Sequence, residues 1–284
     1  MESDSDNFMK LKKYIILFFI AWAVFPASNL DAAEGFDHSL WDSFLKKYVN
    51  EKGEVNYQAV VRDPKLLNDY WNSLLSSNLQ LIQTQFSREE SLAFWLNVYH
   101  AALIKLVTEH YPISSTQKIP SFWDITLVHF GKEGDKTRQY SLNDIRIKNL
   151  MAIYRDERVH LALSMAAQDG PPMMREAFTG PKVQGQIFIL TRQFVNNPRF
   201  VDIVPNRKKI FISPIFKWHG KDFKLDFGVP EPIGNFSMVD TAVLSFLAYY
   251  LEDESKIEYL QGAHYKIEYP AFDWTLNDWK VDVS

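Results

Sequence analysis

A histidine inside an apolar run is the first residue of this sequence that could carry out chemistry. His160 lies in the segment 159–173, VHLALSMAAQDGPPM, ahead of a turn of small residues and a Pro-Pro pair. An imidazole here could act as a general base that activates water or Ser164, with Asp222 or Asp169 as the orienting acid. A histidine among apolar residues is more often a hydrogen-bonded core residue. The sequence leaves both interpretations open.

The absence of cysteine removes whole classes of chemistry. With no cysteine in the chain, thiol catalysis, zinc–thiolate sites and disulfides are excluded. The motifs G-x-S-x-G, H-E-x-x-H, the P-loop and G-x-G-x-x-G are also absent. None of the seven histidines stands three or four residues from another, so we expect no metal and no cofactor. A metal site assembled from histidines distant in the sequence stays open.

Two further groups of residues are candidates for binding. Asn97 and His100 share one face of a helix that is apolar nearly all round, where His100 is a second candidate base. Trp218, His219 and Asp222 form a polar and aromatic cluster after a strand, where binding residues often lie on loops. The candidate ligand-binding residues are therefore Trp95, Asn97, Tyr99, His160, Trp218 and His219.

The N-terminus predicts export. Three lysines precede a twelve-residue apolar run at 14–25, followed by Pro-Ala-Ser, which is typical of a secretory signal peptide over residues 1–33. Met9 is the expected physiological start, because it removes an acidic prefix that fits a signal poorly. We therefore expect a periplasmic or secreted protein without stable membrane insertion after cleavage; an uncleaved anchor is the alternative. The net charge of −4 argues against nucleic acid as a partner.

The remaining sequence predicts one α+β domain over residues 34–284, because no repeat or linker divides it. The N-terminal part is expected to be helical, with a buried central helix from a capping box at 87–90 to about His110, packed on a mainly antiparallel sheet. Further expected helices are 142–154, 177–194 and 239–251; expected strands are 125–130, 136–140, 158–163, 200–204, 209–215 and 265–269.

Five sequence blocks in a fixed order resemble the family catalogued as domain of unknown function (DUF) 547. They are FWLNVYHA at 94–101, SLNDI at 141–145, RVHLAL at 158–163, SPIFKW with DF at 213–223, and the residues from Tyr269 to DWTLN at 273–277. The resemblance covers about residues 55–277 and implies no established activity. In the family, two cysteines and a Glu-His pair are consistent with a thiol site. This chain has Met165 and Gly170 at the cysteine positions, Arg146-Ile147 at the Glu-His pair, and His100 at the position of a usual Asn.

These departures lead to a non-catalytic hypothesis. We expect an exported domain that binds an envelope peptide, glycan or protein partner and performs no thiol chemistry. The alternative is a hydrolase with a base at His160 or His100 that activates Ser164 or water. A third possibility is a structural envelope protein that binds no small ligand.

Overall fold

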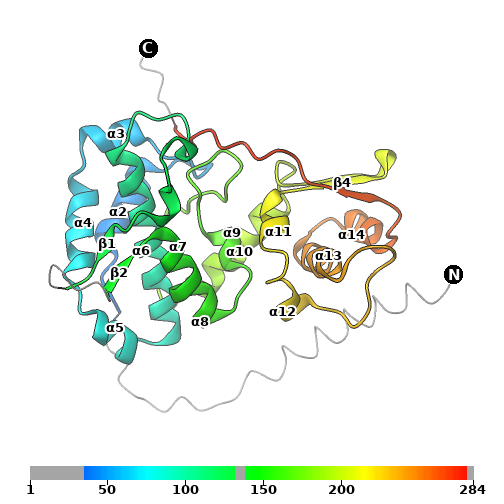
Figure 1. Cartoon of the computed structure of the whole chain (residues 1–284), viewed down its shortest axis with the longest axis horizontal. Coiled ribbons are helices and arrows are strands. Elements are labelled where there is room, and N and C mark those ends of the chain that lie inside the picture. The colour runs from blue at the N-terminus through cyan, green and yellow to red at the C-terminus, as the bar shows by residue number, and fades with distance from the viewer. Residues whose placement is uncertain (1–34, 132–137, 280–284) are drawn as a thin grey trace.

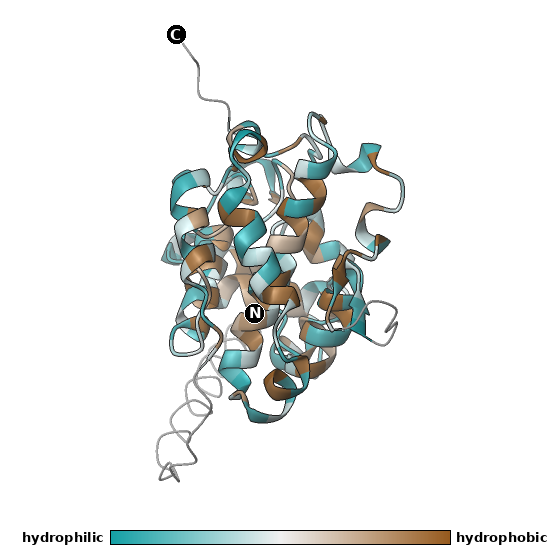
Figure 2. Ribbon diagram, turned by 90° about the vertical axis from the view of Figure 1, so that its left-hand side faces the viewer, coloured by the Kyte–Doolittle hydropathy of each residue, from teal (hydrophilic) through white to brown (hydrophobic). Residues whose placement is uncertain are grey.

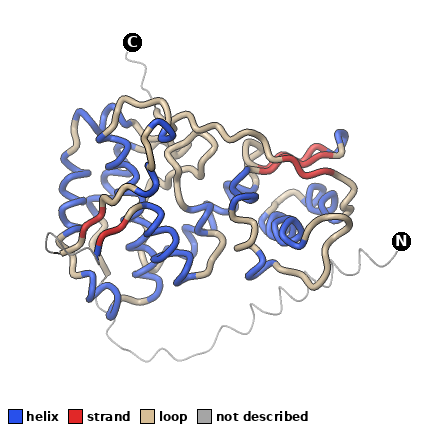
Figure 3. Tube along the Cα trace, viewed as in Figure 1, coloured by secondary structure: helices blue, strands red, loops and turns tan. Residues whose placement is uncertain are grey.

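A computed structural model describes residues 35–131 and 138–279 of the chain. The signal peptide expected at 1–33 and the start expected at Met9 lie outside the described residues. Helices dominate the fold, and the strands are confined to two small sheets (Figures 1 and 3). The predicted α+β class is confirmed.

The elements follow one another as short helices interrupted by two hairpins. The helices are α2 (Ser39–Tyr48), α3 (Tyr57–Arg62), α4 (Lys65–Leu75), α5 (Leu79–Gln85), α6 (Arg88–Glu109), α7 (Leu142–Asp144), a π-helical segment (Ile145–Met151), α8 (Ala152–Tyr154), α9 (Val159–Ala162), α10 (Val183–Val195), α11 (Pro214–Trp218), α12 (Lys224–Phe227), α13 (Met238–Tyr250) and α14 (Glu254–Gln261). The strands are β1 (Val128–His129), β2 (Gln139–Tyr140), β3 (Val201–Val204), β4 (Lys209–Ile212) and β5 (Lys266–Glu268).

The long helix α6 forms the centre of the first half of the fold. Ser87 caps it, since its hydroxyl accepts a hydrogen bond from the Glu90 backbone nitrogen at 3.0 Å. Among the described residues, α6 is the one helix long and apolar enough to cross a membrane, but 83% of its most apolar window is buried inside the protein. This burial is typical of the core helix of a globular fold.

The buried apolar residues form two clusters. In the ribbon coloured by hydropathy, hydrophobic and hydrophilic segments alternate along the helices (Figure 2). The first cluster contains α2 to α6, β1 and most of α10, and the second contains β3, β4, α11 and α13. In the second, β4 pairs antiparallel with β3 and parallel with β5. The sheet therefore belongs to the same cluster as α13. We had expected α6 to pack on a sheet, but it packs mainly on other helices.

The expected strand at 158–163 is wrong. Residues Val159–Ala162 form the short helix α9, closed by a hydrogen bond from the Leu163 nitrogen to the Val159 carbonyl at 3.1 Å. A short apolar run does not distinguish a strand from a buried helical turn. Here the helical turn places Val159 in the first cluster and Leu161 in the second. The expected helix at 177–194 begins later, at Val183, and the hairpin at 200–215 is confirmed as β3 and β4.

Candidate functional site

Two short helices, α9 and α11, lie where the two apolar clusters meet. They bring His160 close to His219 and Asp222, which follow it by 59 and 62 positions in the sequence. His160 lies on α9, and His219 and Asp222 lie on the turn that follows α11. The turn is tight, because the Asp222 nitrogen donates to the His219 carbonyl at 2.9 Å. Gly220 is required in it: a Cβ there would lie 2.6 Å from the Val239 side chain and 2.8 Å from the Phe216 carbonyl oxygen.

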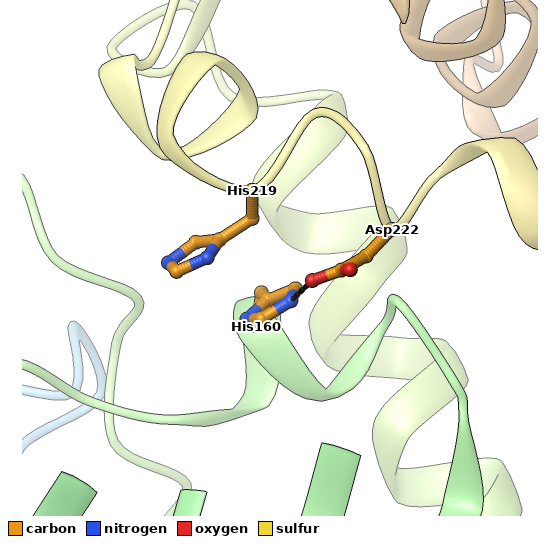
Figure 4. Close-up of side chains that lie close together, drawn as sticks. All are labelled: His160, His219 and Asp222. Atoms are coloured by element: carbon orange, nitrogen blue, oxygen red, sulfur yellow. Dashed lines mark hydrogen bonds and ion pairs between the residues drawn. The ribbon is translucent and has the colours of Figure 1, made fainter. Parts of the chain in front are cut away.

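His160 and Asp222 form a hydrogen-bonded pair (Figure 4). The His160 Nε2 lies 2.8 Å from Asp222 Oδ2, so this nitrogen carries the proton and donates it to the carboxylate. The other ring nitrogen, Nδ1, is then an acceptor; it is buried and has no hydrogen-bond partner among the described residues. The side chain of His160 is 1% exposed and that of Asp222 is 42% exposed. The pair thus joins a buried base to a carboxylate at the surface.

His219 covers His160 as a parallel stacked ring. The ring centroids are 3.8 Å apart and the ring planes differ by 6°. Burial, followed by the charges of His160 and Arg146, lowers the pKa of His219 to about 3. Burial also lowers the pKa of His160, against the opposing effect of Asp222. At neutral pH the site therefore holds two uncharged imidazoles, whose stacking meets no charge repulsion.

Asp222 supplies the negative charge of this site. The hydrogen bond from His160 is the main cause of its lowered pKa, and Arg146 contributes to the same shift. The Arg146 guanidinium also donates to the Asn143 side chain at 3.1 Å. Arg146 was missed as a site residue in the sequence analysis. With Arg146 positive, Asp222 negative and both imidazoles neutral, the four side chains have a net charge of about zero at neutral pH.

The cluster has the residue types of a metal site, but its two imidazole rings are not oriented to share a metal ion. One ligand atom from each of His160, His219 and Asp222 lies within 4.8 Å of the others. An imidazole nitrogen binds a metal along the plane of its ring, and two parallel stacked planes share no such point. The positive charge of Arg146 also disfavours a cation here. The three residues do not fit a shared metal ion unless His219 turns away.

A partly exposed aromatic patch is formed by the exposed Trp218, which directly precedes His219 in the sequence, and the half-buried Phe272 and Trp274. Trp218 stacks on Trp274 with centroids 5.9 Å apart and planes at 21°, and lies 5.1 Å from Phe272. Trp218 is 45% exposed, although large aromatic side chains are mostly buried. We call Trp218, Phe272 and Trp274 the aromatic patch. An apolar platform beside a few polar groups is typical of ligand sites.

Five of the predicted site residues on or near α6 are core residues: Trp95, Asn97, Tyr99, His100 and Ser164. Asn97 exchanges two hydrogen bonds with the Phe178 backbone, at 2.8 and 3.1 Å. The Tyr99 hydroxyl donates to the Ser164 carbonyl at 3.1 Å, and both residues are buried. Trp95 is also buried and packs edge-on against Phe130 and Tyr140.

His100 has both ring nitrogens satisfied inside the core. Its Nδ1 donates to the Leu96 carbonyl at 2.8 Å, and its Nε2 accepts from the Ser164 backbone nitrogen at 3.2 Å. Burial lowers its pKa to about 4, so the ring is neutral at neutral pH. His100 and Ser164 therefore join α6 to the segment after α9, and neither side chain is open to a substrate in this arrangement.

Asp169 has a different environment from Asp222. Its carboxylate accepts from Arg199 Nε at 2.8 Å and from the Asp273 backbone nitrogen at 2.7 Å. Both oxygens are thus used to hold a loop against the C-terminal segment. The structure pairs Asp222, and not Asp169, with His160.

The fold and the site together define a mainly helical α+β protein with a paired histidine–carboxylate site. Residues 83–195, from the end of α5 through α10, match the family described as "Protein of unknown function, DUF547". The match confirms the family expected from the sequence over a segment that includes His160. No curated protein and no solved structure matches the chain.

Met165 and Gly170, where the resemblance places cysteines, are in contact here. A Cβ placed on Gly170 would lie 3.1 Å from the Cβ of Met165, close to the separation of about 3.5–4.5 Å found in disulfides. We expect the Met165→Cys/Gly170→Cys double variant to form a disulfide in air and to be about 2 kcal/mol more stable than its reduced form. Thiol titration and denaturation with and without reductant measure this. Two free thiols in the folded, oxidised sample would contradict it.

Proposed function

We propose that this protein is an exported binding protein without thiol chemistry, whose ligand lies on the aromatic patch beside His219 and Asp222. The observation that carries the proposal is the exposed Trp218, which stacks on Trp274 and directly precedes His219 in the sequence. The face favours a glycan: the ring of a sugar has apolar faces that pack on tryptophan, and its hydroxyls can reach an imidazole and a carboxylate. A peptide is the alternative ligand.

The proposal is tested by Trp218→Ala. We expect glycan binding to weaken at least about tenfold, since stacking and the buried area of one tryptophan contribute about 1.4 kcal/mol or more. Calorimetric titration with N-acetylglucosamine trimer and maltotriose measures the loss, with tri-alanine as the peptide probe. Tyr249→Ala is the matched control, because Tyr249 is 44% exposed but lies on α13. Equal affinities of both variants for every probe would rule out the aromatic patch.

A second candidate is a hydrolase that uses His160, and the Asp222 hydrogen bond is the observation that favours it. A carboxylate that holds one ring nitrogen orients the other as a base, as in known catalytic triads. Here that nitrogen is Nδ1, which lies beneath His219, so a water molecule could be activated only after His219 moves. Turnover of an activated ester that is lost in both His160→Gln and Asp222→Asn would favour the hydrolase over a binding protein.

A further inference from the structure

A polar pocket separate from the histidine cluster lies between four parts of the chain: residues 50–54, 167–175 and 190–200, and Asn277. Its volume is about 530 Å³, within the range of about 300–1,000 Å³ common for small-molecule sites. Five amide side chains, together with Arg175, give the pocket its chemistry, and we call it the amide pocket. These residues are Asn50, Gln168, Arg175, Gln193, Asn197 and Asn277; Arg199 also lines the pocket.

Backbone contacts fix one wall of the amide pocket. Gly53 has a positive φ of 76°, and its carbonyl accepts from the Met173 nitrogen at 3.3 Å. A Cβ on Gly53 would lie 2.5 Å from the Pro172 side chain. The loop 50–54 can approach the segment 167–175 this closely only with glycine at this position. The wall is therefore preformed.

One buried hydrogen-bond donor on the pocket lining lacks an acceptor. Asn277 is 5% exposed, and its Oδ1 already accepts from the Tyr57 hydroxyl at 2.9 Å. The Nε of Arg175, in contrast, is buried and has no partner in the described part of the chain. Buried donors are nearly always paired. The lining thus calls for a ligand that offers oxygen acceptors.

The lining carries three positive side chains, Lys52, Arg175 and Arg199, and two negative ones, Glu51 and Glu54, which leaves a small excess of positive charge for an anionic ligand. Arg175 forms an ion pair with Glu51, whose side chain is 85% exposed. Such an exposed pair contributes little, so a ligand carboxylate that meets the guanidinium with two hydrogen bonds can replace it. Lys52 also lines the pocket and has no ion pair among the described residues. Arg199 is already held by Asp169 and Asp273.

We propose that the amide pocket binds a small molecule that bears a carboxylate, in the size range of a short peptide, with the carboxylate at Arg175. The pocket is separate from the aromatic patch, so the proposal does not depend on the function proposed above. Glu51 occupies the guanidinium in the free protein and competes with the ligand. This competition makes an unusual prediction, because removing a charged residue from the rim should strengthen binding.

The test compares tri-alanine with a free carboxylate and its C-terminal amide. We expect the free acid to bind at least tenfold more tightly than the amide in calorimetric titration. Arg175→Met should abolish this preference, and Glu51→Gln should raise the affinity for the free acid severalfold. Gln193→Trp should block binding by filling the pocket from the exposed face of α10.

The matched control for the blocking variant is Gln80→Trp, which introduces the same side chain at an exposed position of α5. It should bind the free acid like the unmodified protein. Equal affinities for the acid and the amide, no binding of the acid up to about 10 mM, or full binding by Gln193→Trp would each overturn the proposal. The outcome is independent of Trp218→Ala, which leaves the amide pocket intact.

Discussion

Replacing Glu157 by glutamine should stabilise the protein by roughly 3 kcal/mol at pH 7. The Glu157 side chain is 2% exposed, and one of its oxygens has no hydrogen-bond partner among the described residues. Burial, with smaller effects of Asp156 and Asp226, raises its pKa from 4.5 to about 8. The folded state therefore holds a neutral acid at pH 7, whereas the unfolded chain ionises and gains free energy. Glutamine has nearly the same shape as glutamic acid but cannot ionise, so the unfolded variant does not gain this free energy.

The pH dependence of this effect has a definite sign. The folded pKa is higher than the unfolded one, so stability from the neutral acid is complete below about pH 4.5 and is lost as the pH rises to about 8. The free energy of unfolding of Glu157→Gln should match the wild type near pH 4.5 and exceed it increasingly up to pH 8. Urea denaturation at several pH values measures this. The exposed Glu258→Gln is the control, and parallel curves for wild type and Glu157→Gln would refute the prediction.

His100→Asn should remove a large part of the acid sensitivity. Burial lowers the pKa of His100 to about 4, and an unfolded histidine has a pKa near 6.5. A lowered folded pKa means that stability is present above about pH 6.5 and is lost as the pH falls toward 4. Between pH 7 and 4.5 this residue alone should cost the wild type roughly 2 kcal/mol.

Asparagine keeps one of the two contacts of His100. It can donate to the Leu96 carbonyl but leaves the Ser164 nitrogen without its acceptor, which costs about 2 kcal/mol at pH 7. The wild type should thus be more stable at pH 7, and this advantage should vanish near pH 4.5. The control is His110→Asn, since His110 bonds Leu106 in the same way but at an exposed helix end. An advantage of the wild type that stays constant from pH 7 to 4.5 would contradict the assigned role.

Glu157 and His100 change the stability in opposite directions as the pH rises. His38, another buried histidine with a pKa lowered by burial to about 4, adds to the loss of stability in acid. Glu157 causes a loss as the pH rises. We therefore expect maximal stability near pH 6 to 7.

The sequence alone determined the features that depend on residue type and on short spacing. Because the chain has no cysteine, a thiol site is excluded whatever fold the chain adopts. The capped apolar run of α6 and the two expected strands at 200–204 and 209–215 are local signals, and the structure contains the helix and the β3–β4 hairpin. The ordered sequence blocks also identified the family, which the match over residues 83–195 confirms.

Only the tertiary structure decided which polar residues could form a site. His100 and His160 look alike in sequence, since both stand among apolar residues. His100 has both nitrogens bonded inside the core, whereas His160 meets Asp222, 62 positions away, and keeps one nitrogen free. The difference depends on long-range packing of α9 against α11, which no local pattern encodes. The same reason applies to the buried Oε2 of Glu157 and to the buried Nε of Arg175, which lack partners in the described part of the chain only because distant segments pack around them.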